Sequence, residues 1–458
     1  MPDDQHAPER LRRYLNDLKP EARASLLADL EAGALRREQL PEANLILAEL
    51  RRMRTGPREH PSPDRLFFSP VMPFVIDDDP ARKHSGRIAR HSLERIWQWI
   101  ARDLAPQETS TFADEVSTCA GKPADIEALA RSFQDRMSRA VYEALTSARN
   151  DPKAERQLVG RIGTPRALDE ARDIAAILKV RDPLAALAKR VPPTIGNLSE
   201  HQLDNMMALL DQPSVRPLFL YAVLLVMSRL AAPWQLIRLA TKAAGTDDSD
   251  RVAESRYAVT ITAVLAEMEA MVWRLDAALK AADIQPIGRL LKDIHDTARG
   301  LRTEINLAVD SAWARQLAAL RSEVSKRLGA QIESTPGKVR RLLRPPRQVG
   351  RESVIDPADT AEIETAIELV GTCRTYASEL AINEAALRVW SDLQAVLERE
   401  TSTLLAGLRQ SGDGEQRYRQ SQLDAAVRFA AQVFGVEYAS LLTKAAEVAR
   451  SDRKTVRA

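Results

Sequence analysis

The residues best suited to chemistry are six histidines, two cysteines and one run of three acidic residues. His84 and His91 would share one face of a helix, but they lie about 10 Å apart along it, too far to bind one zinc ion. The Asp77–Asp79 triplet offers ligands for a hard cation, although such a cluster more often marks the start of a helix. We therefore predict no metal ion and no cofactor.

Sequence motifs for catalysis are also missing. The pair His295-Asp296 resembles the metal-binding pair of HD-type phosphohydrolases, but it lies inside a heptad pattern without the further histidines of that site. Cys119 and Cys373 suit a reducing compartment and would pack as small apolar side chains. Neither a glycine-rich phosphate loop nor a Gly-x-Ser-x-Gly elbow occurs. We expect a protein that is not an enzyme, and an enzyme with its site around Asp77–His91 is the third alternative.

Two basic segments are candidate binding surfaces for an anion or an acidic partner. In the first, residues 82–95, the spacing predicts that Lys83, Arg87 and Arg90 share one helix face. Because an apolar segment precedes it, this helix could lie on an anionic membrane or on an acidic protein. We favour the other interpretation, in which the apolar segment fills a groove between helices and the two nearby tryptophans are core residues.

The second basic segment spans residues 338–351 and contains no acidic residue. Its charges could hold nucleic-acid phosphates, anionic lipid or an acidic protein. No aromatic residue lies between them to stack on bases, which weakens the nucleic-acid alternative. A solvated loop at the tip of a helix bundle explains the same residues equally well. The candidate side chains are Lys338, Arg340, Arg341, Arg344, Arg347 and Arg351.

The elements that position these residues are predicted to be helices. The chain has 458 residues, of which 45% are hydrophobic and 28% charged, as in a globular protein of two or three structural units. Aromatic residues make up only 5% and there are 18 glycines, whereas the good helix formers Ala, Leu, Arg and Glu dominate. Since 66 basic residues nearly balance 64 acidic ones, any charged partner must be recognised by a local patch. The predicted fold class is all-α.

The clearest pattern is a 3.5-residue repeat of apolar residues between 257 and 312, broken once at 283–286. Two adjacent segments with this period predict a supercoiled antiparallel pair of helices. The second helix, continued to Leu328, would have about 42 residues and a length of about 60 Å. The repeat consists of Tyr257, Ile261, Val264, Met268, Met271, Leu275, Ala278 and Ala282, followed by Ile287, Leu291, Ile294, Ala298, Leu301, Ile305, Ala308 and Ala312.

Two further rows of apolar residues at heptad spacing, here called seams, lie in the C-terminal half. They predict that this half is an elongated antiparallel bundle of long heptad-patterned helices. One seam follows residues 363–380, in a helix that Asp356 and Pro357 begin. The other belongs to a last helix, which is predicted to pack through Leu423, Val427, Ala430, Phe434, Leu441, Ala445 and Val448.

Prolines and glycines divide the chain into an N-terminal unit of short helices at 1–57, a Pro-rich apolar strap at 58–80, a central helical region at 81–245 and the long-helix bundle at 246–458, with a basic linker at 330–355. The prolines of the strap are predicted to exclude any helix there.

Two helices of the central region have predicted boundaries. Asp79 would cap a helix that has Pro80 at its first position and runs to about Leu104. A second helix, at 217–244, is apolar nearly all round and would be buried, with Pro233 kinking or splitting it.

Location and function follow from these patterns as expectations. The polar N-terminus has no secretory apolar region, and the run Pro217–Met227 is shorter than the ~20 residues that span a bilayer, so the expected location is the cytoplasm. We expect an interaction, scaffold or regulatory protein that presents helical surfaces to protein partners, and small seam residues also allow a homo-oligomer. No small-molecule substrate is predicted. The alternative is peripheral association with an anionic membrane or nucleic acid through 338–351 and 82–95.

Overall fold

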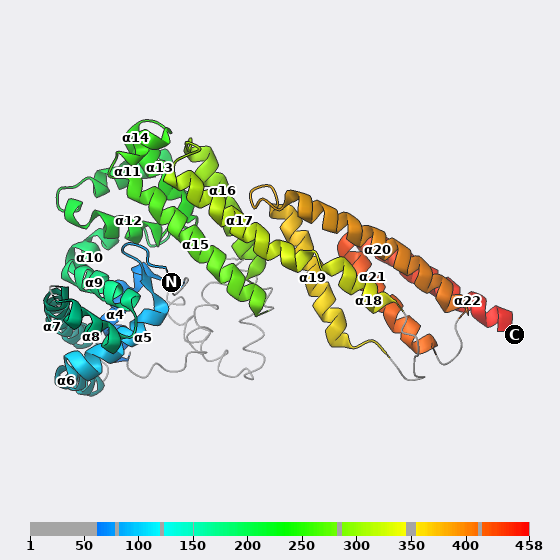
Figure 1. Cartoon of the computed structure of the whole chain (residues 1–458), viewed down its shortest axis with the longest axis horizontal. Helices are drawn as coiled ribbons and strands as arrows, with labels where there is room; N and C mark the ends of the chain where they lie inside the picture. The colour runs from blue at the N-terminus through cyan, green and yellow to red at the C-terminus, as the bar shows by residue number, and fades with distance from the viewer. Residues whose placement is uncertain are drawn as a thin grey trace, which may run out of the picture. The chain divides into compact units, whose positions relative to one another are not determined.

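The described part of the chain is almost entirely helical, so the predicted all-α class is confirmed (Figure 1). Within it, the only paired strands are β1 (Val75–Ile76) and β2 (Ile88–Ala89). None of the described helices is long and apolar enough to cross a membrane. The computed structural model describes residues 62–77, 82–119, 123–149, 151–281, 286–344, 354–410 and 415–457, so the predicted unit at 1–57 lies outside the described residues.

The chain divides into two compact units. The first contains residues up to Ser69 together with Trp97–Ala140, and the second contains Pro70–Ile96 together with all residues from Val141 onward. Both candidate basic segments belong to the second unit.

The first unit has an aromatic core. Phe67 contacts Phe68 and Trp97, and its ring centroid lies 5.7 Å from that of Phe133. Phe112 stacks on Phe133 with a centroid distance of 4.3 Å. Burial of several aromatic rings in contact is a large stabilising contribution for a small unit. The helices and turns that supply these side chains are α4 (Pro63–Phe68), α5 (Arg90–Trp99), η3 (Ile100–Leu104), α6 (Pro106–Thr118) and α7 (Pro123–Arg149).

The prediction that the strap contains no helix was wrong. Pro63 lies in the first turn of α4, where the missing N–H group costs nothing because it would have no partner within the helix. A 3-10 helix, η2 (Ser69–Phe74), follows and includes Pro73. The apolar side chains Val71 and Phe74 are buried, which agrees with the interpretation of the strap as groove-filling.

The predicted start of the next helix was also wrong. Asp79 and Pro80 lie outside the described residues, and α5 begins only at Arg90. The preceding residues form a turn and then β2, which pairs in parallel with β1. This turn needs Gly86, because its backbone has a φ of 71° and a β-carbon there would come within 2.8 Å of the Leu224 side chain.

The predicted helix at 217–244 is split, as the position of Pro233 suggested. The helix α12 (Phe219–Met227) is buried from Ala222 onward, and Pro233 begins the short turn η5 (Pro233–Leu236). The helices of this region are α8 (Pro152–Ile162), α9 (Pro165–Lys179), α10 (Arg181–Arg190), α11 (Glu200–Leu210), η4 (Arg216–Leu218), α12 (Phe219–Met227), η5 (Pro233–Leu236), α13 (Ile237–Ala244) and α14 (Ser249–Ala253).

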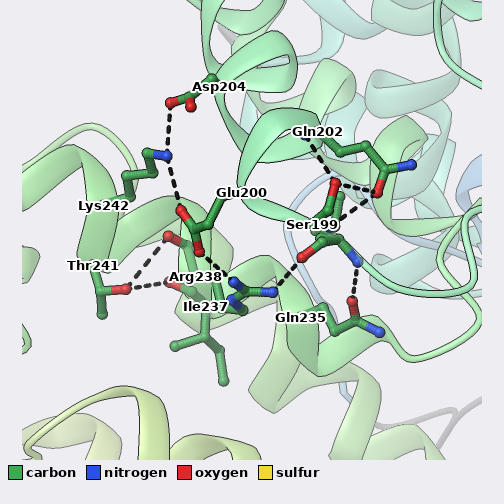
Figure 2. A network of polar contacts seen from close by, with 10 residues as sticks. Ser199, Glu200, Gln202, Asp204, Gln235, Ile237, Arg238, Thr241 and Lys242 are labelled. Carbon is green, nitrogen blue, oxygen red and sulfur yellow. Dashed lines mark hydrogen bonds and ion pairs between the residues drawn. The ribbon is translucent and has the colours of Figure 1, made fainter.

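A network of hydrogen bonds and ion pairs connects the start of α11 to α13 (Figure 2). Arg238 donates to Glu200 at 2.6 Å, and Lys242 lies between the carboxylates of Glu200 and Asp204 at 3.1 and 2.6 Å. Ser199 caps α11 as part of a reciprocal capping box with Gln202. Because these ion pairs are largely exposed, they orient the two helices and add little stability.

The 3.5-residue repeat is buried from Tyr257 to Ala278 and from Ile287 to Ile305, as predicted. Its predicted end was wrong, because Ala308 is half-buried and Ala312 is exposed, and Ala282 lies outside the described residues. Met268 and Leu301 are both 0% exposed, and α15 (Ala258–Lys280) packs against α16 (Ile287–Glu304) and α17 (Ala312–Ile332). The antiparallel supercoil stays a prediction.

The predicted helix of about 42 residues was wrong, because the chain leaves helical geometry between α16 and α17. There the N–H of Asn306 donates to the Asp247 carbonyl at 2.8 Å, and Ser249 N–H donates to the Asn306 carbonyl at 3.2 Å. These bonds to a distant segment replace helical ones, and Ser311 then caps α17 through Ala314.

The last described helices also contact one another, with α20 packed on α18, α19, α21 and α22 (Figure 1). The prediction of one helix from 423 to 448 was wrong, because Gly435, with a φ of 94°, separates two helices. The predicted basic linker is in part the helix α18. The bounds are α18 (Thr335–Leu343), α19 (Pro357–Tyr376), α20 (Asn383–Gln410), α21 (Gln416–Phe434) and α22 (Val436–Arg457).

Candidate functional site

The first predicted basic surface, Lys83, Arg87 and Arg90, is not a helix face. Lys83 forms an ion pair of 2.5 Å with Asp173 and donates to two backbone carbonyls. Arg87 is only 4% exposed and donates to Glu267 at 2.6 Å. Each of these two cations is thus held by a carboxylate of the same unit.

Arg90 is exposed and lies at the first position of α5. Its Nε donates to Asp77 Oδ1 at 2.8 Å. Asp77, which the enzyme alternative would use together with a histidine, therefore neutralises an arginine.

A charged pocket of about 480 Å³ lies beside the β1–β2 pair. Glu267 accepts from Arg87 and also from Arg274, at 3.0 Å, so one carboxylate serves two guanidinium groups. The pocket walls carry Met72, Ile76, Met227, Leu230 and Pro233. Pockets of this size hold small molecules, and the surplus of arginine suits an anion, but internal ion pairs occupy the charges.

Burial lowers the pKa of His84 from 6.5 to about 4, and the nearby Arg166 and Arg87 act in the same direction. The pKa of His91 is also lowered, first by burial and then by Arg166. His84 is therefore neutral at physiological pH. Its Nε2 atom lies 3.8 Å from a carboxylate oxygen of Glu269, but at that pH it carries no charge that could form an ion pair with this carboxylate.

We expect acid to destabilise the protein through His84. Between pH 6.5 and about 4 the unfolded chain binds a proton that the folded chain does not, so the free energy of unfolding should fall as the pH is lowered through this window. Urea denaturation at pH 7, 6 and 5 measures this slope. His84→Gln, which cannot titrate, should flatten it, and an unchanged slope in this variant would contradict the assignment.

The second predicted basic surface begins on a helix rather than in a loop. α18 buries Pro336, Val339 and Leu343. On its outer side Lys338 pairs with Glu362 at 2.7 Å, and Arg344, just after the helix, lies 3.6 Å from Glu400. Carboxylates therefore neutralise part of the predicted cationic surface. Arg340 is half-buried and Arg341 is exposed, whereas Arg347 and Arg351 lie outside the described residues.

A groove of about 550 Å³ lies among α16, α19, α20 and α21. Its lining includes Gly288, Gly371, Thr372 and Trp390. Arg374 covers the Trp390 ring at 4.8 Å, a cation–π contact. Its mixed polar and apolar lining does not define one ligand chemistry.

The most distinctive surface is an apolar stripe on α22, formed by Tyr438, Leu441, Ala445 and Val448. Leu441 is 64% exposed and Val448 is 53% exposed. The prediction that these two residues lie in the core was wrong. The helix instead turns a neighbouring face inward, which consists of Ala439, Leu442, Ala446 and Ala449.

Both faces of α22 step by 3, 4 and 3 residues, the spacing of a helix seam. α22 therefore carries two seams about 100° apart. One is buried, and the other has Leu441 and Val448 exposed and Tyr438 and Ala445 half-buried. The sequence contained part of this signal, because the adjacent residues Leu441 and Leu442 project about 100° apart around a helix.

Chemistry-bearing groups elsewhere are dispersed. Among the residues that the structure describes, no three His, Cys, Asp or Glu side chains gather in a way that could hold a metal ion. Burial raises the pKa of the Cys373 thiol to about 12, so little thiolate forms near neutral pH. Comparisons with known protein families, with curated proteins and with solved structures find no match to this chain.

Proposed function

We propose that this chain is a non-enzymatic interaction protein, a scaffold or regulator, that binds a helical partner through the apolar stripe of α22. The observation that carries the proposal is the exposure of Leu441 and Val448 at heptad spacing on a helix whose other seam is already filled. A partner helix that inserts side chains between them would bury apolar surface at both residues.

The energetics support this assignment. A fully buried leucine or valine contributes about 1.5–3 kcal/mol relative to an exposed one, so leaving two of them in water on one stripe forgoes several kcal/mol. Single exposed apolar residues are common on protein surfaces, but a row at helix-seam spacing is a typical interaction site.

The charged segments support membrane or nucleic-acid association less well. Lys83, Arg87 and Lys338 are each within 2.7 Å of a carboxylate of the same chain. Phosphate groups would have to compete with these carboxylates, which are already in place.

The stripe can be tested by placing a photoreactive amino acid at position 441 in the full-length protein in cells. Ser440 is the matched control, because it is exposed on the same helix and polar. We expect discrete crosslinked species from position 441 and none from position 440. Leu441→Glu should weaken binding of the crosslinked partner at least tenfold, about 1.4 kcal/mol, because it places a charge in an apolar contact.

The same substitution should leave the fold intact, since exposed positions tolerate change within about 0.5 kcal/mol. Thermal unfolding monitored by circular dichroism checks this. Equal crosslinking from positions 440 and 441 would remove the proposal.

A further inference from the structure

We propose that the partner of the α22 stripe is a second copy of this chain, with the two α22 helices antiparallel about a twofold axis. This inference rests on the proposed function and names the occupant of the same surface.

Most small residues of the other seams are not available for a second copy. Ala298, Cys373 and Ala377 would each permit close approach of another helix, but all three are buried within the chain itself, whereas Ala308 is half-buried and Ala312 is exposed. On the α22 stripe, by contrast, Leu441 and Val448 are exposed.

In a twofold-symmetric contact, residue i of one copy meets residue j of the other and the reverse contact occurs as well. An antiparallel alignment that places Leu441 opposite the partner's Tyr438 gives two such contacts. The Phe434 ring, at the end of α21, lies 4.5 Å from that of Tyr438 within the same chain, so the partner would present an aromatic pair towards Ala445. A small side chain thus faces an aromatic pair, and a large one faces a leucine, which is the complementarity that close packing needs.

Charges beside the stripe favour this alignment. Glu437 and Lys444 precede Tyr438 and Ala445 by one residue, so they flank the stripe on the same side. Both are exposed, and neither has an ion-pair partner among the residues that the structure describes. In the antiparallel alignment Glu437 faces the partner's Lys444, and symmetry makes this two ion pairs.

A competing alignment is disfavoured by the same charges. If Leu441 instead lay opposite the partner's Ala445, the two copies would bring their Lys444 ammonium groups together. Like charges facing each other across a helix pair select against that alignment.

The interface offers few large side chains, so the dimer should be weak and its population should depend on protein concentration.

The experiment is sedimentation velocity of the full-length protein at low salt, from micromolar to near-millimolar concentration. We expect a monomer–dimer equilibrium. Glu437→Lys and Lys444→Glu should each raise the dimer dissociation constant tenfold or more, because each puts two like-charged pairs in the interface. Thr443→Lys, an added charge on the outer face of α22, should leave it unchanged.

The decisive step is to mix the two single variants. In a mixed dimer the lysine introduced at position 437 of one chain would face the glutamate introduced at position 444 of the other. The second contact would join the unchanged Lys444 of the first chain to the unchanged Glu437 of the second, so dimerisation should return to the wild-type level. The double variant with both substitutions should also dimerise normally. Recovery in both cases supports the inference.

Three outcomes of the sedimentation experiments would overturn it: a monomer at every concentration, variants that dimerise like the wild type, or a mixture that stays monomeric. If any of these occurs while position 441 still crosslinks to other proteins, this inference fails and the proposed function stands. Crosslinks from position 441 to the same chain's own N-terminal segment, residues 1–61, would overturn the second-copy assignment.

Discussion

Replacing Glu170 with alanine is expected to lower the free energy of unfolding by about 3–5 kcal/mol. Glu170 is 0% exposed, and its Oε1 accepts from Arg166 Nε at 2.7 Å and from the Ala89 N–H at 3.1 Å. Without the carboxylate, the buried Arg166 guanidinium and the Ala89 N–H of β2 both lose their hydrogen bond to Glu170. Urea denaturation of the purified protein measures the loss.

Asp169→Ala provides the matched control. Asp169 precedes Glu170 on α9 and also pairs with an arginine, Arg172, but its side chain is half exposed. Exposed ion pairs contribute about 0–1 kcal/mol, so this variant should remain close to wild type. Similar losses from the two substitutions would show that burial does not decide the contribution of Glu170.

Gly300→Ala is expected to destabilise the protein by about 1–2 kcal/mol, although alanine is the better helix former. Gly300 lies on α16 against the indole of Trp234, and a β-carbon there would come within 2.6 Å of the ring. The contact involves ring atoms close to the Trp234 backbone, so the indole cannot swing away without moving η5. The overpacking cost should exceed the gain in helix propensity.

Gly329→Ala should change the free energy of unfolding in the opposite direction and stabilise the protein. This glycine lies inside α17, and a β-carbon added there would meet no neighbouring atom within 4 Å. We expect stabilisation of up to about 1 kcal/mol from helix propensity alone. Chemical denaturation of the two variants side by side gives the comparison, and stabilisation by both would contradict the tight contact at Trp234.

Sequence patterns predicted much of the fold because long amphipathic segments leave few alternatives. The repeat through Met268 and Leu301 fixed which side chains are buried, and Pro233 marked where the apolar central segment is divided. Both signals are local, and tertiary contacts reinforce them.

Helix ends were predicted less well because long-range bonds decide them. Asp79-Pro80 is a strong local start signal, yet α5 begins at Arg90, after a strand whose Ala89 N–H donates to Glu170 on another helix. Likewise the apolar spacing continues through Ile305, but the Asn306 backbone bonds to Asp247 instead. No pattern within either segment identifies its distant partner.

The candidate site was predicted only in part. The apolar residues of the last helix were recognised, but a helix with two adjacent seams does not reveal which one its own chain fills. The structure resolves this, because Leu442 is buried whereas Leu441 is exposed. The basic residues were recognised by their charge, but the carboxylates opposite Lys83 and Arg87 come from α9 and α15.

The backbone bridge between Asp248 and Asn306 has a consequence for protease resistance. Ala308 N–H also donates to the Ser249 hydroxyl, 59 residues away, so the first part of the connection between α16 and α17 is bonded to the segment around Ser249. A protease needs several residues of extended, unbonded chain in its cleft. Cleavage next to Asn306 or Ala308 therefore requires these bonds to open first, so the protease resistance of that part of the connection depends on the segment that begins α14.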